Sequence, residues 1–432
     1  MASKSVQTLS SVDPSSVKPQ ESCRVCKAKN LVTYFDFGLM PLANRNLSLS
    51  QLDLKEPVFP LQLLFCKTCG LSQLSLVVAP EVLYQGYTYH SSVSQTFQQH
   101  CREIVSTLKQ HLDLKPKGLV VEIASNDGCL LSKFAESGFQ VIGVEPAKEL
   151  ASLTQAQGFT TFCQFWGPGV AVEIQRQFGK VDLVIGTNVM AHVDDLDEFL
   201  GAVNSILGPE GHLVFEVPYM ANYIEQLEFD TTYHEHLSYF LLSPLKRVLE
   251  ANGFCIIDVQ RLKIHGGSIR VICGKKSAAH AVSASVEALL TFERDMGLLE
   301  EDIYLKFAAR IHHLRDRLRL LLSSLKQKSK HIAAYGASAK GNILLNYCGI
   351  GKETIDYIID DTPQKQGKFQ SGTHIPIVDS SRMLKERPDY LLILAWNFTE
   401  ELMNKTAKYY QTGGNYIVPI PEVKVLNSSS PL

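Results

Sequence analysis

Two Cys-x-x-Cys pairs, Cys23-Arg-Val-Cys26 and Cys66-Lys-Thr-Cys69, place the strongest constraint on how the N-terminal part of this chain folds. Each such turn directs its two sulfurs toward one point, so two turns together offer four thiolates in the tetrahedral arrangement that Zn²⁺ prefers. The gap of residues 27 to 65, which is 39 residues, exceeds the usual spacing of about 15–20, so the chain between them must loop out and return. We predict a closed, structural zinc site on these four cysteines, in preference to a redox pair, which needs only one motif.

The bulk composition is that of a globular protein without a nucleic-acid partner. Of 432 residues, 45% are hydrophobic and 20% are charged, and the formal net charge of -2 leaves no basic footprint. No apolar run approaches the roughly 20 residues that span a bilayer, and the Ser-rich N-terminus lacks a targeting pattern. We therefore expect a cytoplasmic protein with no membrane partner. Six further cysteines are expected to be buried free thiols: Cys101, Cys129, Cys163, Cys255, Cys273 and Cys348.

Strand and helix patterns alternate twice along the chain, which predicts an α/β fold with doubly wound parallel sheets. The expected strands are Leu119–Ile123, Val141–Val144, Val181–Gly186 and His212–Val217, and then His331–Tyr335, Ile355–Ile359 and Leu391–Ala395. A helical stretch over 283–328 separates the two series. Its apolar stripe is expected to pack between domains: Ile303, Phe307, Ile311, Leu314, Leu318 and Leu321.

These patterns predict five parts. A disordered tail covers residues 1–22, the zinc-binding domain 23–90, a central Rossmann-like domain 91–280, linking helices 281–330, and a second Rossmann-like domain 331–426.

The segment Val120-Val-Glu-Ile-Ala-Ser-Asn-Asp-Gly128 is typical of a strand that turns tightly into a helix. Gly128 lets the backbone approach a ligand closely, and the next strand ends at Glu145, whose carboxylate can accept from both ribose hydroxyls. The segment lacks the G-x-G-x-x-G of a pyrophosphate binder. A ligand with a positive centre and no phosphate fits its acidic residues better, which favours S-adenosylmethionine over a plain βα turn with incidental acids. The predicted cofactor-binding residues are Glu122, Ala124, Asn126, Asp127, Gly128, Glu145 and Asn188.

The segment Thr231-Thr-Tyr-His-Glu-His-Leu-Ser238 follows the fourth expected strand, at the end where open α/β sheets bind ligands. An extended segment would place Tyr233 and Glu235 on one face and the two histidines on the other. A helical one would make Tyr233 and His236 i,i+3 neighbours. Either way, a neutral imidazole oriented by a carboxylate is suited to act as a general base. The His-x-His pattern also allows a metal site, although no third ligand is evident nearby.

Taken in order, these motifs resemble the sugar C-methyltransferase family, which acts on nucleotide-linked 4-keto-deoxyhexoses. The resemblance runs from Cys23 to about Val425. It includes the Cys-Arg-Val-Cys knuckle, Tyr87-x-Tyr-His-Ser-Ser, Glu-Ile-Ala-Ser-Asn-Asp-Gly, Tyr-x-Glu-His, His265-Gly-Gly267, Tyr335-Gly-Ala-Ser-Ala-Lys340 and Asp361-Thr-Pro-x-Lys365.

The resemblance implies that the central domain binds S-adenosylmethionine as methyl donor and that the C-terminal domain helps bind the sugar nucleotide. It implies that His236 removes a proton from the carbon beside the ketone, with Tyr233 and His192 donating to the enolate oxygen. Glu235 would orient His236 or hold a sugar hydroxyl. The implied sugar-pocket residues also include Tyr87 and Tyr89, and the implied substrate-binding residues are His265, Ser338 and Lys340.

Two other functions remain open at this stage. An oxidoreductase would hold a dinucleotide on Gly336–Gly341 with Asp360 or Asp361 on the ribose, although that loop lacks the third glycine spacing. A non-catalytic protein that binds nucleotide sugars would keep the same domains without turnover. The loop Gly336–Gly341, which includes Lys340, either binds a pyrophosphate or is a structural βα turn. The sequence indicates neither the nucleobase, nor the methylated carbon, nor the oligomeric state.

Overall fold

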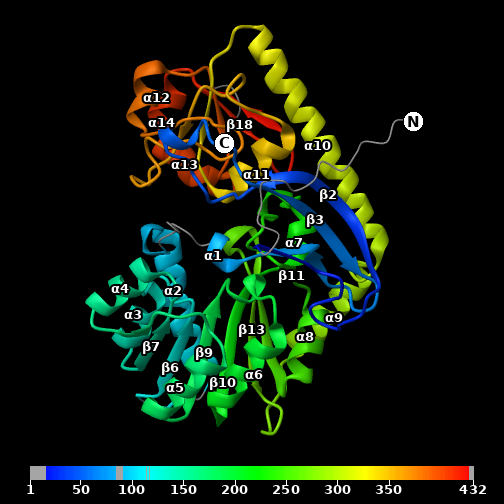
Figure 1. Cartoon of the computed structure of the whole chain (residues 1–432), viewed down its shortest axis with the longest axis vertical. Helices are drawn as coiled ribbons and strands as arrows, with labels where there is room; N and C mark the ends of the chain where they lie inside the picture. Colours follow the sequence, from blue (N-terminus) through cyan, green and yellow to red (C-terminus); the bar gives the residue numbers. More distant parts are fainter. Residues whose placement is uncertain (1–15, 84–90, 113, 116, 428–432) are drawn as a thin grey trace.

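The computed structural model describes residues 16–83, 91–112, 114–115 and 117–427. Figure 1 shows the central domain below the C-terminal domain, with the long N-terminal strands between them and one long helix along the side. Over the described residues the sheets have seven, six, four and two strands. In this part of the chain, no helix combines the length and apolar character needed to cross a bilayer.

The seven-stranded central sheet has the order β12-β13-β10-β9-β6-β7-β8. Its parallel strands are β6 (Leu119–Ile123), β7 (Gln140–Val144), β8 (Thr160–Phe162), β9 (Val181–Thr187) and β10 (Leu207–Pro218). The four strands expected here correspond to β6, β7, β9 and β10, and the α/β fold is confirmed. The expectation of a fully parallel sheet is wrong at β13 (Ser268–Lys275), which runs antiparallel to β10 and to β12 (Phe254–Leu262). The short connection between β12 and β13 permits only an antiparallel pair, because a parallel crossover needs a dozen or more residues.

Helices cover both faces of this sheet. They are α2 (Gln95–His111), α3 (Cys129–Glu136), α4 (Lys148–Ala156), α5 (Pro168–Phe178), α6 (Leu196–Ile206), α7 (Met220–Glu225) and α8 (Leu242–Ala251). Short 3-10 helices lie in connections of the described chain: η3 (Ser91–Val93) before α2, η4 (Met190–His192) after β9, η5 (Phe229–Thr231) after α7 and η6 (Ile264–Gly266) after β12.

The four-stranded N-terminal sheet takes one of its strands from the central domain. Its order is β11-β4-β3-β2, with β2 (Leu31–Pro41), β3 (Val58–Cys66), β4 (Ser72–Leu74) and β11 (Ser238–Tyr239). β11 pairs antiparallel with β4 through Ser238 opposite Gln73 and Tyr239 opposite Ser72. The segment with the titrating side chains is therefore attached directly to the cysteine-bearing domain.

The end of the expected disordered tail is ordered, so that expectation is wrong there. β1 (Val17–Pro19) pairs antiparallel with β5 (Leu76–Val78), which precedes α1 (Pro80–Leu83). Val17 packs against a small buried cluster that includes Phe59 and Val78, and this burial explains why the segment is fixed. Residues 1–15 and 428–432 lie outside the described range.

The expected helical stretch forms two helices, α9 (Ala284–Asp295) and α10 (Glu301–Gln327). The prediction that its stripe packs between domains is confirmed, since α10 contacts both β2 and the C-terminal helix α11 (Ala339–Cys348). At one point on α10, the His312 ring lies 5.3 Å from the Phe35 ring of β2, and its Nδ1 lies 2.9 Å from the Tyr347 hydroxyl of α11. Of the predicted stripe, Phe307, Ile311, Leu314 and Leu318 are buried.

The C-terminal sheet has the order β16-β15-β14-β17-β18-β19 and is parallel except for its last pair. The strands are β14 (Ile332–Tyr335), β15 (Ile358–Ile359), β16 (Ile377–Val378), β17 (Tyr390–Ile393), β18 (Asn415–Val418) and β19 (Lys424–Leu426). The expected strand over residues 355–359 is shortened to its last two residues. α12 (Ser381–Glu386), η7 (Trp396–Phe398), α13 (Thr399–Lys405) and α14 (Ala407–Gln411) complete the domain.

Candidate active site

The four predicted zinc ligands meet at one point. The sulfurs of Cys23 and Cys69 lie 3.5 Å apart, as do those of Cys26 and Cys66, and all four lie within 4.8 Å of one another. A tetrahedron with Zn–S bonds of about 2.3 Å separates its sulfurs by about 3.8 Å. The residues therefore fit Zn²⁺, and among the described residues they form the one group of three or more metal-type ligands.

The predicted cofactor turn has an unusual backbone. Ala124, Asn126 and Asn188 have φ values of 57°, 50° and 57°, and Gly128 has 81°. Non-glycine residues rarely adopt positive φ, and such residues cluster at functional sites. Ala124, Asn126 and Gly128 follow β6, and Asn188 follows the adjacent strand β9, so the strained positions meet at the carboxyl edge of the sheet, where ligands of this fold bind.

The acidic residues around this turn hold its backbone. The Glu145 carboxylate accepts from the backbone N–H groups of Asn126 and Ala147, both at 2.9 Å, and Asp127 accepts from Ser92 N–H at 2.9 Å. Burial raises the pKa of Glu145 and raises that of Glu122 well above its usual range. Burial therefore disfavours the charged form of Glu122, which is the form that the sequence argument used.

Two buried acceptors at this edge fit a ligand that donates hydrogen bonds. Asn188 Oδ1 and Glu122 Oε2 are both inaccessible to solvent and have no hydrogen-bond partner within the described residues. Buried polar atoms are normally paired. An ammonium group, such as that of S-adenosylmethionine, would supply a donor to these two oxygens.

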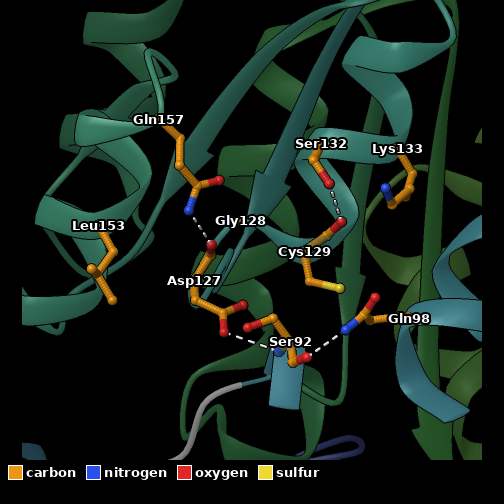
Figure 2. Close-up of a pocket in the computed structure, with 9 residues that line it drawn as sticks. All are labelled: Ser92, Gln98, Asp127, Gly128, Cys129, Ser132, Lys133, Leu153 and Gln157. Carbon is orange, nitrogen blue, oxygen red and sulfur yellow. Dashed lines mark hydrogen bonds between the residues drawn. The ribbon is translucent and has the colours of Figure 1, made fainter. Parts of the chain in front are cut away.

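A cavity of about 350 Å³ adjoins the outer side of the turn, between α2, α3 and α4. Figure 2 shows Asp127 and Ser92 joined across it, with Gln98 donating to the Ser92 carbonyl and Gln157 donating to the Asp127 carbonyl. Of the predicted cofactor residues, this cavity includes Asp127 and Gly128 but neither Glu145 nor Asn188.

His236 is held by two hydrogen bonds that fix its orientation. Its Nδ1 lies 3.0 Å from the carbonyl oxygen of Thr231, and its Nε2 lies 2.8 Å from the hydroxyl of Tyr233. A carbonyl can only accept, so Nδ1 carries the proton and Nε2 is the basic nitrogen. The contact between residues 233 and 236 corresponds to the helical alternative of the sequence prediction, because the segment forms a turn rather than a strand.

Glu235 binds a residue of the N-terminal domain that lies in the turn after β2. Its Oε1 accepts from the side-chain amide of Asn44 at 2.7 Å, and burial raises its pKa to about 7. His234 faces the N-terminal sheet, with Nε2 at 3.3 Å from the Pro60 carbonyl oxygen. The two histidines of His-x-His therefore diverge, and the metal alternative for this pair finds no support among the described residues.

The third predicted side chain, His192, lies beside the base. Its ring centre is 4.9 Å from that of His236, with the rings nearly perpendicular, and burial lowers its pKa to about 4. It is therefore neutral at physiological pH. η4, which ends at His192, is tied to the base segment because Leu237 N–H donates to the Ala191 carbonyl at 2.7 Å.

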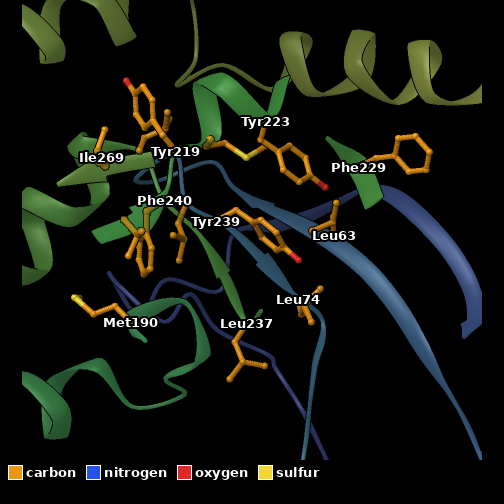
Figure 3. Packing of buried hydrophobic residues seen from close by; sticks show 14 of the residues in the cluster. Leu63, Leu74, Met190, Tyr219, Tyr223, Phe229, Leu237, Tyr239, Phe240 and Ile269 are labelled. Atoms are coloured by element: carbon orange, nitrogen blue, oxygen red, sulfur yellow. The ribbon is translucent and has the colours of Figure 1, made fainter. Parts of the chain in front are cut away.

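Leu237, which follows the base directly, is fixed by the N-terminal domain. Its carbonyl oxygen accepts from Leu74 N–H at 3.0 Å and from the buried guanidinium of Arg24, within the first knuckle, at 3.1 Å. Figure 3 shows Leu237 and Tyr239 lying against Leu74 and the strands of the N-terminal sheet. The zinc knuckle thus contacts the backbone next to His236.

The polar groups of the C-terminal loop are hydrogen-bonded or ion-paired within the protein. Ser338 caps α11 by accepting from Gly341 N–H at 3.1 Å, and the ammonium of Lys340 lies 3.3 Å from Glu228. Asp360 accepts from Ala337 N–H at 2.8 Å and from Thr362 N–H at 2.9 Å. Asp361 accepts from the hydroxyl of Tyr335 and the ammonium of Lys405. The carboxylates required by the oxidoreductase alternative are therefore engaged within the protein.

Three predicted site residues are not located. Tyr87 and Tyr89 lie outside the described residues, and so does the side chain of His265. Other residues were missed by sequence reasoning. Asn44 gives no signal beyond a turn-rich segment, and the Thr231 carbonyl is a backbone group that no side-chain pattern can reveal.

A cofactor turn at the carboxyl edge of an α/β sheet, a poised imidazole and a four-cysteine zinc site together define the class of S-adenosylmethionine-dependent methyltransferases with an N-terminal zinc domain. Three family models match this chain: "Putative zinc binding domain" over residues 23–84, "Methyltransferase domain" over 94–259 and "C-methyltransferase C-terminal domain" over 263–421. The C-methyltransferase NovU of Streptomyces niveus is 36% identical over 416 residues, which cover 96% of this chain and 99% of that protein. The chain belongs to this C-methyltransferase family and is an S-adenosylmethionine-dependent enzyme.

Two similar solved structures each cover less than half of the chain. Magnesium protoporphyrin IX methyltransferase of Synechocystis PCC 6803, with bound SAM, is 16% identical at a TM-score of 0.33 and covers 45% of this chain and 88% of that one. The PH0226 protein of Pyrococcus horikoshii OT3 is 13% identical at a TM-score of 0.34 and covers 44% and 95%. At these scores the likeness carries no inference about substrate or mechanism.

Proposed function

We propose that this C-methyltransferase methylates the carbon beside the ketone of a nucleotide-linked 4-keto-deoxysugar, through an enolate that His236 generates. The observation that carries the proposal is the pair of hydrogen bonds on the imidazole. The Thr231 carbonyl keeps the proton on Nδ1, which leaves Nε2 as the base. A ketone lowers the barrier to removing a proton from the adjacent carbon, and a sugar offers such a carbon once one hydroxyl is oxidised.

Tyr233 and His192 are the proposed hydrogen-bond donors to the enolate oxygen. In the structure, the Tyr233 hydroxyl is hydrogen-bonded to Nε2 of His236. Rotation about its C–O bond transfers its hydrogen bond from Nε2 to the substrate oxygen, which frees the base and stabilises the developing charge. S-adenosylmethionine supplies the methyl group that the carbon accepts. Burial lowers the pKa of His192, so this second proposed donor is neutral.

The proposed contacts to the nucleotide part lie in the C-terminal domain. Lys340 and Ser338 stand at the N-terminus of α11, where backbone N–H groups and the helix dipole favour a phosphate. The Lys340 side chain is 16% exposed and faces Glu228 across the domain boundary. Burial raises the pKa of Glu228, and a diphosphate would compete with this carboxylate for the lysine charge. His265, Tyr87 and Tyr89 remain proposed contacts to the sugar.

His236→Asn tests the proposal. Wild-type protein is incubated with labelled methyl donor and a panel of 4-keto-sugar nucleotides, and exchange of the proton beside the ketone is followed in deuterium oxide. Loss of a general base is expected to slow exchange by at least about 100-fold, while binding of the methyl donor is retained in calorimetry. His111→Asn, at the exposed end of α2, is the matched control. Undiminished exchange in His236→Asn would remove this residue from the role of base.

A further inference from the structure

The 3-10 helix η5 connects the proposed base to the C-terminal domain. Thr231, whose carbonyl binds His236 Nδ1, is the last residue of η5. The helix is buried, and its Phe229 packs against Tyr347 of α11 with ring centres 5.7 Å apart. Any shift of η5 therefore moves the carbonyl that holds the imidazole.

The C-terminal domain holds η5 through one short buried hydrogen bond. The indole N–H of Trp396, the first residue of η7, donates to Asp230 Oδ2 at 2.7 Å, and Asp230 is fully buried. Asp230 directly precedes Thr231. Burial of an acidic side chain is costly unless it is hydrogen-bonded, so the contact is a strong positional constraint on this helix.

A second contact reinforces the first. The ammonium of Lys340 lies 3.3 Å from Glu228, which precedes η5, and 4.9 Å from the centre of the Trp396 ring. On its other side, Glu228 packs against Gly266, where any side chain would collide with the carboxylate. This close approach explains one glycine of the His265-Gly-Gly267 motif. Glu228, at the start of η5, thus lies between Lys340 and Gly266, and Asp230, at the centre of η5, binds Trp396.

We infer that Asp230 and Trp396 are positioning residues for His236. Their hydrogen bond fixes η5, and η5 places the Thr231 carbonyl that keeps the imidazole in the tautomer with a basic Nε2. The C-terminal domain therefore sets the geometry of proton removal, in addition to any contact with the nucleotide. This inference rests on the proposed function for the role of His236 but makes a separate claim about what orients it.

Trp396→Phe tests the inference because it removes the indole N–H and keeps an aromatic ring. The chain offers a matched control in its only other tryptophan, Trp166, whose N–H donates to the Phe199 carbonyl at 3.2 Å. We expect Trp396→Phe to lower the exchange rate beside the ketone by roughly tenfold, with unchanged KM for S-adenosylmethionine. Trp166→Phe is expected to exchange at the wild-type rate. Equal rates in both variants would overturn the inference.

Substitution of the acceptor provides a second test. In Asp230→Asn the amide oxygen can still accept from the indole, so near wild-type exchange is expected. Asp230→Ala removes the acceptor and is expected to match Trp396→Phe. If Asp230→Asn loses as much activity as Asp230→Ala, the hydrogen bond is not what positions the base.

A readout that needs no turnover separates this inference from the proposed function. The Nδ1–H signal of His236 is observed by ¹⁵N-edited NMR and assigned by its disappearance in His236→Asn. It is expected to shift or broaden in Trp396→Phe and to stay unchanged in Trp166→Phe. If the signal is unaffected by Trp396→Phe, the positioning role fails. If instead wild-type protein exchanges no keto-sugar, the proposed function fails while the NMR result still decides the positioning.

Discussion

At the scale of single residues, neighbouring side chains of the segment from Tyr233 to His236 have hydrogen-bond partners in different parts of the fold. Tyr233, Glu235 and His236 are close in sequence, yet Glu235 binds Asn44 while His236 binds Thr231 and Tyr233. The helical alternative of the sequence analysis predicted the contact between Tyr233 and His236, whereas the reactivity of the segment stays a prediction. The sequence could not predict that a backbone carbonyl orients the imidazole, because every residue carries one and only the fold selects which is in reach.

The buried Glu235 gives a prediction on the pH dependence of stability. Burial raises its folded pKa to about 7, above the value near 4.5 of an exposed glutamate. The unfolded chain therefore ionises first, and the contribution of this carboxyl to stability is lost as pH rises through about 7. Glu235→Gln cannot ionise. Its free energy of unfolding relative to wild type is expected to increase by on the order of 2–3 kcal/mol between pH 5 and pH 8.

Urea unfolding of both proteins at the two pH values measures this difference. Glu173→Gln is the control, because Glu173 is exposed and its neighbour Arg176 lowers its pKa to about 2. The control should not gain stability over wild type as pH rises. A gap between Glu235→Gln and wild type that stays constant from pH 5 to pH 8 would show that Glu235 is already ionised in the folded protein.

At the scale of elements, the zinc knuckle and β11 act together on the active site. Arg24, between two zinc ligands, donates to the carbonyls of Leu74 and Leu237, and Leu237 lies between the base and β11. A metal on these cysteines would therefore support the backbone beside His236 as well as the fold of its own domain. The sequence predicted the four ligands from spacing alone, whereas the link to the base depends on a strand pair between residues more than 160 positions apart.

Cys66→Ser tests the coupling of metal and site. The variant is expected to lose stoichiometric zinc, measured by metal analysis, and to lower kcat for methyl transfer by about tenfold or more in the fraction that stays folded. Binding of S-adenosylmethionine should change less, because its turn lies on β6 and β9. Cys163→Ser, at an exposed cysteine outside the cluster, is expected to keep both zinc and activity.

Two outcomes would contradict this prediction. Full zinc content in Cys66→Ser would remove Cys66 from the ligand set. Complete loss of zinc with unchanged kcat would show that the knuckle does not position the base.

At the scale of the whole molecule, α10 contacts both the N-terminal sheet and the C-terminal domain. The sequence analysis predicted these as separate domains. The alternation of patterns predicted two α/β units, and the apolar stripe predicted a helix packed between domains. The antiparallel β13, the ordered β1 and the transfer of β11 to the N-terminal sheet were not predicted. Each depends on pairing between distant segments, which local periodicity does not encode. The same limit applies to Trp396 and Asp230, which are 166 residues apart.

Ile311→Ala measures how strongly α10 holds these parts together. Ile311 is fully buried in the main core, and its truncation is expected to lower the free energy of unfolding by about 2–5 kcal/mol. Because the adjacent His312 contacts both β2 and α11, hydrogen exchange should accelerate in both elements. Leu320→Ala, on the exposed face of α10, is expected to change stability by less than about 0.5 kcal/mol. Faster exchange in α11 alone would show that the N-terminal sheet is stable without this helix.

β11 is synthesised long after its partner β4, and this order has a consequence for biosynthesis. Until Ser238 and Tyr239 emerge from the ribosome, β4 has no partner on the side that they later cover. An open strand edge is a template for intermolecular pairing, and nascent chains that expose one are prone to aggregate. The short length of β4, three residues, limits that hazard until β11 has been synthesised.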